Sequence, residues 1–441
     1  MSGRKADLDV TPGCSVEELR IRAQQMLGVR GRLLSASGTS LHGDFTVQQA
    51  GLRSGDWLTL HTRPLLLSAT SAAVAAVLSD GSVVTWGESD MGGDSGVVPL
   101  DDVRHIEATQ SAFAVIRDDG SVVTWGRPRW GGDSSAVVER LKDVQQIRST
   151  AGAFAALLRS GDVVTWGHPA LGGDSSEVQE QLQNVQQLHA TGEAFAAVLE
   201  DGSVVLAFAA ELADGRVVTW DGSCDGELQN VRTLQASGGA FAAVLATGFV
   251  VAWGRLDCGA DIKAVQEKLK TAQQLQATYS AFAAVLKDGS VVTWGHPANG
   301  GDSSSVQSQL KKAAWVKRIY SNWYAFAAVL ESGAVVTWGD PALGGDSRAV
   351  QEQLKDVQNI DSTQFAFAAT LGDGSVVTWG DCYHEAHCNE VQNQLRSVRQ
   401  LSTCGRAFAA IREDGSVVSW RGNGSPATVV AAALTRGGPE A

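Results

Sequence analysis

Ala-Phe-Ala-Ala-Val-Leu-Lys-Asp-Gly-Ser-Val-Val-Thr-Trp-Gly, residues 281–295, is one copy of a unit that recurs along most of this 441-residue chain. It contains two apolar runs joined by Asp288-Gly289. Asp-Gly between apolar runs is a strong hairpin signal, because the turn requires residues that tolerate positive φ. The runs are apolar on both faces, so both faces should be buried. The unit therefore predicts an antiparallel hairpin inside a layered β-structure.

The hairpin repeats with a period of about 41 residues, which is typical of repeat architectures. Tryptophan ends it at nine positions, namely Trp86, Trp125, Trp166, Trp220, Trp253, Trp294, Trp338, Trp379 and Trp420. Phenylalanine opens it at eight, namely Phe113, Phe154, Phe195, Phe241, Phe282, Phe326, Phe367 and Phe408. A short β-like segment precedes each hairpin, and alanines on one face would let neighbouring sheets approach closely. We predict nine three-stranded units that pack as propeller blades and start near residues 64, 103, 144, 185, 231, 272, 316, 357 and 398.

The connector after each Trp-Gly predicts a short helix in the place that a fourth strand would take in a four-stranded unit. In residues 172–182, Asp or Ser precedes Val and Leu at i, i+4, which indicates an N-capped helix of about two turns. The same acidic position recurs as Asp94, Asp133, Asp174, Asp302 and Asp346. Calcium prefers clustered oxygens, whereas each unit offers one carboxylate. We therefore interpret these aspartates as helix caps rather than metal ligands.

The fourth unit is irregular. Residues 206–215 form a second copy of the hairpin, and the connector is cut to residues 221–226. The unit, 185–230, is expected to end its third strand near Trp220. The sequence leaves open whether this is a genuine variant or an error in the gene model.

The repeat, a small residue, an aromatic, an apolar strand, Asp-Gly, a second strand and Trp-Gly, resembles the regulator of chromosome condensation repeats from residue 64 to about 425. The resemblance implies a β-propeller, which in that family usually has seven blades. Two features depart from the family: Phe195 and its equivalents replace a typical histidine, and Gly-Gly-Asp-Ser replaces Gly-Gln-Leu-Gly after Trp-Gly. Because nine units exceed seven, the array is either a larger ring or an open one.

Residues 1–63 do not share the period. Leu8-Asp9-Val10 indicates a strand, and Ser15 with Glu18 forms a capping-box pattern for a helix that reaches about Leu27. Further strands are expected around residues 32–34 and 57–61. This order resembles a small α+β ubiquitin-like (β-grasp) domain.

The resemblance to ubiquitin-like domains has two exceptions. No counterpart of that fold's first strand precedes Asp7, so the chain is expected to be truncated there. The last strand runs into Arg63-Pro64 without Gly-Gly, so conjugation to other proteins is not expected. The predicted domains are 1–63, ubiquitin-like, and 64–434, the propeller, followed by a tail at 435–441.

Charge and composition exclude several function classes. The net charge is −13, and residues 1–63 carry eight Lys/Arg against six Asp/Glu, which leaves −15 for the remainder. An acidic propeller is a poor partner for nucleic acid, whose main affinity term requires Lys and Arg. No apolar run approaches the roughly 18 residues of a membrane span, and six cysteines favour a reducing compartment. We expect a cytoplasmic or nuclear protein.

The densest group of metal-ligating residues is Cys382, His384, His387 and Cys388. Zinc prefers tetrahedral Cys and His, but the spacing does not match paired Cys-x-x-Cys or His-Glu-x-x-His motifs. A surface loop is the better interpretation, and the sequence predicts no metal and no cofactor. No nucleophile–base pair or phosphate loop appears at a plausible site.

The sequence therefore favours a non-enzymatic scaffold that binds a protein partner through the loop faces of the propeller, with a link to the ubiquitin pathway through residues 1–63. The family resemblance implies two alternatives. One is a guanine-nucleotide exchange factor for a small GTPase, and the other is a fragment of a HERC-type ubiquitin ligase that lacks the catalytic domain. The tryptophans of the repeat are interpreted as structural core rather than as a light-sensing cluster, for which only Trp323 lies in a comparable segment.

Overall fold

A computed structural model describes residues 5–421, apart from 29–30, 42, 97, 99, 201–203, 208–209, 212–216, 219–229, 313–314, 381–390, 392, 405–406 and 414–416. The described chain is mainly β and contains nine three-stranded antiparallel sheets and two two-stranded ones. The nine sheets are β3–β5 (Leu66–Ala69, Ala73–Val77, Val83–Gly87), β6–β8 (Val103–Ala108, Ala112–Arg117, Val122–Gly126), β9–β11 (Val144–Ser149, Ala153–Leu158, Val163–Gly167), β12–β14 (Val185–Ala190, Phe195–Leu199, Val204–Ala207), β17–β19 (Val231–Ala236, Ala240–Leu245, Val250–Gly254), β20–β22 (Ala272–Ala277, Ala281–Leu286, Val291–Gly295), β23–β25 (Val316–Ser321, Ala325–Leu330, Val335–Gly339), β26–β28 (Val357–Ser362, Ala366–Leu371, Val376–Gly380) and β29–β31 (Val398–Cys404, Ala407–Arg412, Val417–Arg421).

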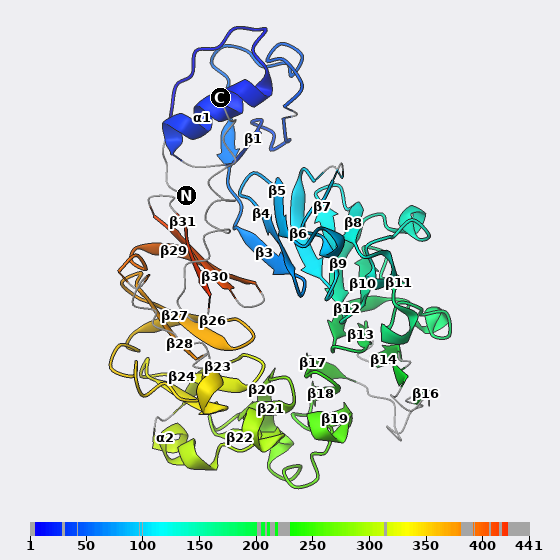
Figure 1. Ribbon diagram of the computed structural model, residues 1–441, viewed down its shortest axis with the longest axis vertical. Helices are drawn as coiled ribbons and strands as arrows, with labels where there is room; N and C mark the ends of the chain where they lie inside the picture. The colour runs from blue at the N-terminus through cyan, green and yellow to red at the C-terminus, as the bar shows by residue number, and fades with distance from the viewer. Residues whose placement is uncertain are drawn as a thin grey trace.

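The sheets follow one another around a ring, and the last meets the first (Figure 1). The first strand of each sheet contacts the first strand of the next, so the first strands are innermost. At the closure, the Gln400 side chain donates to the Leu65 carbonyl at 2.7 Å and accepts from the Leu65 N–H at 3.3 Å. Leu65 and Leu78 also pack against Ile411 there. Of the two arrangements that the sequence left open, the described residues form the closed one.

Neighbouring sheets are held together by the repeated phenylalanine and tryptophan. Phe326 and Trp338 stack with ring centroids 5.2 Å apart, and both are buried. The Trp338 indole donates to the carbonyl of Gly300, which belongs to the connector of the preceding sheet, at 3.1 Å. Gly300 has φ +98°, and a methyl group there would lie 2.5 Å from Cδ2 of Phe326. The contact between two sheets therefore involves the second and third strands of one sheet and the Gly-Gly connector of the sheet before it. Six other sheets contain the same stacked pair: Phe113–Trp125, Phe154–Trp166, Phe241–Trp253, Phe282–Trp294, Phe367–Trp379 and Phe408–Trp420.

A belt of backbone hydrogen bonds also joins the sheets, at the turns between their first and second strands. In each of the first seven turns, one residue donates its N–H to the carbonyl of the matching residue in the next sheet, over 2.7 to 3.2 Å. The belt residues, in order, are Ser71, Gln110, Ala151, Gly192, Gly238, Tyr279, Trp323 and Gln364. Their main-chain groups are therefore satisfied between sheets instead of within one hairpin.

The connectors differ from the prediction of a short helix in each. The connector after β22 contains an α-helix, α2 (Gln307–Lys312), whereas the described parts of the connectors at 88–102, 127–143, 168–184, 255–271 and 340–356 contain 3-10 helices and turns. The predicted capping aspartates instead accept from the N–H two residues on, as Asp302 does from Ser304 at 2.8 Å. The prediction holds in the connector after β22, where η9 and α2 form. It is wrong for the connectors that contain only 3-10 helices and turns, because one tight turn already carries a buried leucine such as Leu182 to the core, and a longer helix would have to recover its nucleation cost. The 3-10 helices are η1 (Ser89–Met91), η2 (Pro128–Trp130), η3 (Val138–Arg140), η4 (Pro169–Leu171), η5 (Gln179–Gln181), η6 (Leu256–Cys258), η7 (Leu269–Thr271), η8 (Pro297–Asn299), η9 (Ser304–Val306) and η10 (Pro341–Leu343).

The fourth sheet uses the first copy of its duplicated hairpin. Its third strand is β14, in which Ala207 pairs with Phe195 where other sheets pair tryptophan with phenylalanine. The second copy forms a separate two-stranded hairpin, β15 (Ala210–Glu211) with β16 (Val217–Val218). Trp220, which was expected to end the third strand, lies outside the described residues.

The N-terminal segment (residues 5–63) contains helix α1 (Val16–Leu27) and an antiparallel pair, β1 (Arg32–Leu34) with β2 (Thr59–His61). Ser15 caps α1 by accepting from the Glu18 N–H at 3.1 Å, as predicted. The reciprocal half of the capping box was not observed, because the Glu18 carboxylate pairs with Arg22. The strand expected at residues 8–10 is wrong: Leu8 and Val10 pack on the small core around Val16 without pairing as a strand.

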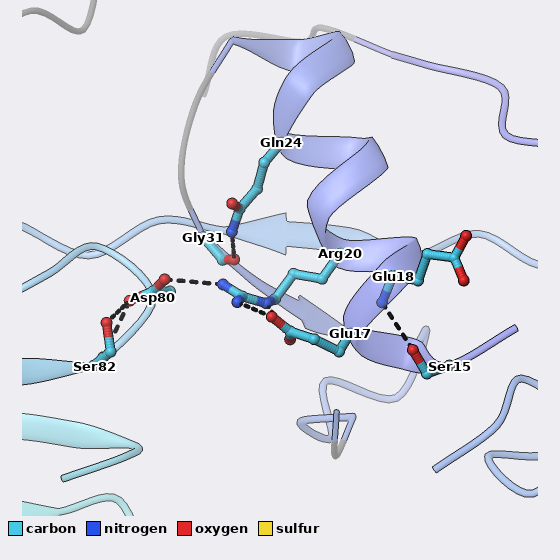
Figure 2. Close-up of polar contacts among 8 residues, drawn as sticks. All are labelled: Ser15, Glu17, Glu18, Arg20, Gln24, Gly31, Asp80 and Ser82. Carbon is cyan, nitrogen blue, oxygen red and sulfur yellow. Dashed lines mark hydrogen bonds and ion pairs between the residues drawn. The ribbon is translucent and has the colours of Figure 1, made fainter. Parts of the chain in front are cut away.

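This segment docks on the hairpin turns of the first two sheets through arginine–aspartate pairs. Arg20 donates to Asp80 at 2.9 Å and to Glu17 at 2.5 Å, and Asp80 also accepts from Ser82 at 2.6 Å (Figure 2). Burial opposes ionisation of Asp80, but the Ser82 and Arg20 bonds outweigh it and lower the pKa of its carboxyl. A second cluster joins Arg32 and Arg63 to Asp118, which Arg63 reaches at 2.6 Å. The basic segment and the acidic ring are thus complementary in charge at their contact.

Candidate functional site

Three consecutive belt turns carry aromatic residues where the preceding turns carry small or polar ones. They contribute Tyr279 from the turn after β20, Trp323 and Tyr324 after β23, and Phe365 after β26. We call these four residues the aromatic arc. The matching positions in the first five sheets are occupied by Ser71-Ala72, Gln110-Ser111, Ala151-Gly152, Gly192-Glu193 and Gly238-Gly239. The repeat itself therefore does not require an aromatic side chain there.

The four rings form one continuous surface. The Tyr279 and Trp323 centroids are 5.6 Å apart, those of Trp323 and Phe365 6.2 Å, and those of Tyr324 and Phe365 5.8 Å. Tyr279 is 45% exposed and Trp323 41%, whereas Tyr324 and Phe365 are half-buried. Exposed aromatic area that spans several elements is unusual on a water-facing surface and marks interaction sites.

Buried polar residues fix the turns that carry Tyr279, Trp323 and Tyr324. Thr278 accepts from the Ala281 N–H at 3.0 Å and donates to the carbonyl of Asn299 at 2.9 Å. Asn322 acts in the same way, since its oxygen accepts from Ala325 N–H at 2.7 Å and its amide donates to the Leu343 carbonyl at 2.6 Å. These two turns are thereby tied to the 3-10 helices that follow their own sheets, η8 and η10. The aromatic arc stands on a rigid base.

The polar groups of the exposed rings are available for a ligand. In the described part of the chain, the Tyr279 hydroxyl, the Tyr324 hydroxyl and the Trp323 indole N–H have no hydrogen-bond partner. Burial, with a contribution from neighbouring Cys258 and Glu193, raises the pKa of the Tyr279 hydroxyl. This hydroxyl therefore stays protonated at neutral pH and can donate a hydrogen bond.

Charged residues flank the Tyr279 end of the aromatic arc. Arg255 pairs with Asp257 at 2.8 Å and with Glu193 at 3.5 Å, so two carboxylates share one guanidinium. Burial raises the pKa of the Cys258 thiol beneath them to about 11, which keeps it neutral and unreactive. This end of the site carries an excess of negative charge.

A second polar region lines the inner strands. A cavity of about 300 Å³ lies along β17, β20 and β23, and its polar lining includes Gln273, Gln274 and Arg318. Farther round the ring, Arg148 donates to Glu107 at 3.3 Å and lies close to His189. No group with catalytic geometry was found among the described residues of this region. The inner strands therefore form a hydrophilic lining, and the aromatic arc is the stronger candidate site.

His189 provides a pH test of this inner lining. Burial, assisted by Arg148, lowers the pKa of His189 to about 4, against about 6.5 in an unfolded chain. Between these values the unfolded state binds more protons, so stability falls as pH falls. When the pH is lowered from 7 to 5, the free energy of unfolding of the unsubstituted protein should fall by about 1 to 2 kcal/mol more than that of the His189→Gln variant. Urea denaturation at both pH values measures this difference, and parallel losses in the two proteins would contradict it.

Those residues singled out by the sequence that the structure describes do not form a second site. Cys382, His384, His387 and Cys388 lie outside the described residues. Asp94, Asp133, Asp174, Asp302 and Asp346 lie in separate turns. Within the described ranges, no three His, Cys, Asp or Glu side chains converge as metal ligands, and no helix is long and apolar enough to cross a bilayer.

The aromatic arc was not predicted from the sequence. The sequence singles out Trp323 only as the one tryptophan in a segment comparable with a light-sensing cluster and predicts no binding role for it, but its side chain is exposed. A usable signal existed: at two adjacent positions of the repeat, aromatic residues replace small or polar ones in three consecutive units.

No family model and no curated protein matches this chain. Solved structures similar to it include the CRINKLY WD40 ectodomain of the Arabidopsis thaliana receptor kinase ACR4, at 16% identity over 70% of this chain and 92% of that chain, with a TM-score of 0.34. Prp20p from Saccharomyces cerevisiae, the yeast RCC1, matches at 14% identity over 68% and 75%, with a TM-score of 0.37. The computationally designed Ika8 protein matches at 15% identity over 73% and 96%, also with a TM-score of 0.37. These TM-scores are low, and the strand pairing of the chain itself defines its fold.

Proposed function

We propose that this chain is a non-enzymatic scaffold that binds a partner protein through the aromatic arc. The observation that carries the proposal is the exposure of Tyr279 and Trp323 on a rigid loop face, at positions where the repeat needs no aromatic residue. Tyrosine and tryptophan dominate the binding energy of protein interfaces because they bury a large area and lose little side-chain entropy. The half-buried Tyr324 and Phe365 would complete the apolar centre of such an interface.

The same proposal includes two statements about architecture. The nine three-stranded sheets and their closure support a nine-bladed propeller of the regulator of chromosome condensation type at residues 64–434. Helix α1 and the β1–β2 pair support a ubiquitin-like fold for residues 1–63, with the charged contact at Asp80 fixing it to the propeller. In this arrangement the N-terminal segment occupies the hairpin-turn face, and the opposite face is left to the partner.

The partner is more consistent with a protein than with nucleic acid. The chain carries a net charge of −13, and its aromatic arc is flanked by Glu193 and Asp257. Phosphates would be repelled there, although flat aromatic rings alone could stack with bases. Among the described residues we find no observation that favours nucleotide exchange over simple binding.

Affinity capture with matched variants tests the proposal. The full chain, the double variant Tyr279→Ser/Trp323→Ala and the control Trp315→Ala are used as bait, and captured proteins are quantified by mass spectrometry. Trp315 is 50% exposed but lies before β23, away from the belt turns. The captured amount of at least one partner should fall by about tenfold or more with the double variant, which corresponds to a loss of about 1.4 kcal/mol of binding free energy. The control variant should capture the same partner in an unchanged amount. Identical partner sets for all three baits would contradict the proposal.

A further inference from the structure

We infer that the segment seated on the aromatic arc is an extended, proline-rich peptide with a basic residue next to its proline run. This inference rests on the proposed function and specifies the chemistry of the partner. Three features carry it: the side chains of the arc have free hydrogen-bond donors, the backbone groups of the arc are already paired, and one end of the arc is negatively charged.

The backbone of the arc cannot bind a peptide as an added strand. Tyr279 donates its N–H to the Trp323 carbonyl at 2.8 Å, and Trp323 donates to the Gln364 carbonyl at 3.2 Å. The Tyr279 carbonyl accepts from Gly238 at 2.7 Å. Strand addition requires a row of unpaired main-chain groups, and in these turns the belt already uses them. Recognition must therefore use the side chains.

The exposed side chains present flat apolar faces and hydrogen-bond donors. An indole N–H can only donate, and a tyrosine hydroxyl that remains protonated donates readily. A proline-rich segment has the complementary inventory, because proline lacks the N–H and keeps the carbonyl acceptor. Such a segment is also preformed as a polyproline II helix with solvated carbonyls, so little entropy is lost on binding. Aromatic-lined surfaces recognise proline-rich peptides in this way.

The charge at the Tyr279 end specifies the flanking residue. Glu193 and Asp257 share Arg255, which leaves one net negative charge beside the ring. A methyl group on Gly238 would lie 2.6 Å from Cε2 of Tyr279, so the ring packs against the preceding sheet, whose connector carries Asp257. An arginine or lysine next to the proline run would meet this charge and the face of the ring.

The ring geometry disfavours a cage for a methylated ammonium group. Such cages hold the cation between separated rings, whereas the Tyr279–Trp323 and Tyr324–Phe365 centroids are only 5.6 and 5.8 Å apart. The rings of each pair are in contact, so no space remains between them for a cation. The arc offers a surface to lie on, not a hollow to enter.

Fluorescence anisotropy with a labelled peptide tests the inference. The probe is a fluorescein-labelled decaproline peptide with one terminal arginine, and the comparison peptide has the same length and arginine with alternating glycine and serine. The full chain should bind the proline probe saturably and at least about tenfold more tightly than the comparison peptide. Trp323→Ala should weaken binding about tenfold or more, Tyr279→Phe should weaken it about three- to tenfold, and Trp315→Ala should leave it unchanged.

Tyr279→Phe removes a single oxygen and leaves the ring in place, so it keeps the test valid if Trp323→Ala fails to fold. Absence of saturable binding, equal binding of both peptides, or an equal loss in Trp315→Ala would overturn the inference. Were the proline probe not bound while affinity capture still depended on Tyr279 and Trp323, the inference would fail and the proposed function would stand. Loss of that dependence in affinity capture would instead contradict the proposed function itself.

Discussion

Replacing Phe326 by alanine is expected to lower the free energy of unfolding by about 4 kcal/mol. The phenyl ring is fully buried, stacks on Trp338 at 5.2 Å and lies against Gly300 of the preceding sheet. Its removal would leave a cavity at the contact between two sheets, where rigid backbone on both sides prevents collapse. Urea denaturation followed by tryptophan fluorescence measures the loss.

Phe249→Ala is the matched control, since the same side chain is removed from a position that is 45% exposed. That variant should lose less than about 1 kcal/mol, because little burial is given up. Equal losses in the two variants would show that Phe326 does not hold the sheets together.

Gly300→Ala is expected to cost about 3 kcal/mol, the sum of backbone strain and overpacking. Gly300 has φ +98°, and the added methyl would collide with the Phe326 ring at 2.5 Å. To relieve the collision, the turn would have to shift, and the hydrogen bond from the Trp338 indole to the Gly300 carbonyl would lengthen. Urea denaturation measures the loss of unfolding free energy, from the midpoint of the transition and its dependence on urea concentration.

Gly96→Ala separates the two contributions. Gly96 also has a positive φ, +59°, but no heavy atom lies within 4 Å of a methyl placed there. Only the strain of about 1 kcal/mol should remain. If Gly96→Ala proved as costly as Gly300→Ala, the close approach of glycine to the phenyl ring would not explain the Gly-Gly repeat.

The strands of the ring could be predicted because their signals are local. The turn at Asp288-Gly289 and the spacing from Phe282 to Trp294 are sufficient to define the second and third strands of a sheet, and the structure confirms this pairing. The stacked aromatic pairs follow from the same register. The predicted first strand is also confirmed, as at residues 272–277.

The connectors could not be predicted, because tertiary packing decides their form. The Asp174 side chain binds the N–H of Ser176 as readily as it would cap a helix, and both conformations present Leu182 to the core. The fourth sheet could not be predicted for a related reason. Two candidate third strands follow Phe195, and only the pairing of β13 with β14 shows which is used.

The candidate site was missed because aromatic identity alone does not separate core from surface. Trp338 and Trp323 are fifteen positions apart in one unit, yet Trp338 is 2% exposed and Trp323 is 41% exposed. The difference arises because Trp323 lies in a belt turn, where its backbone bonds to the neighbouring sheets and its side chain faces solvent. Comparing the same position across units is the step that would have identified Tyr279 and Trp323.

The belt of backbone hydrogen bonds has a consequence for how the array tolerates change. The link from Gly192 to Gly238 spans the fourth unit at 3.1 Å, as if no hairpin had been duplicated between them. Registration of one unit with the next is therefore set near the axis, and extra chain at the periphery, such as β15 and β16, leaves it undisturbed. The outer edges of the units become places where insertions accumulate without loss of closure, so the ring can acquire new peripheral surfaces while its centre is preserved.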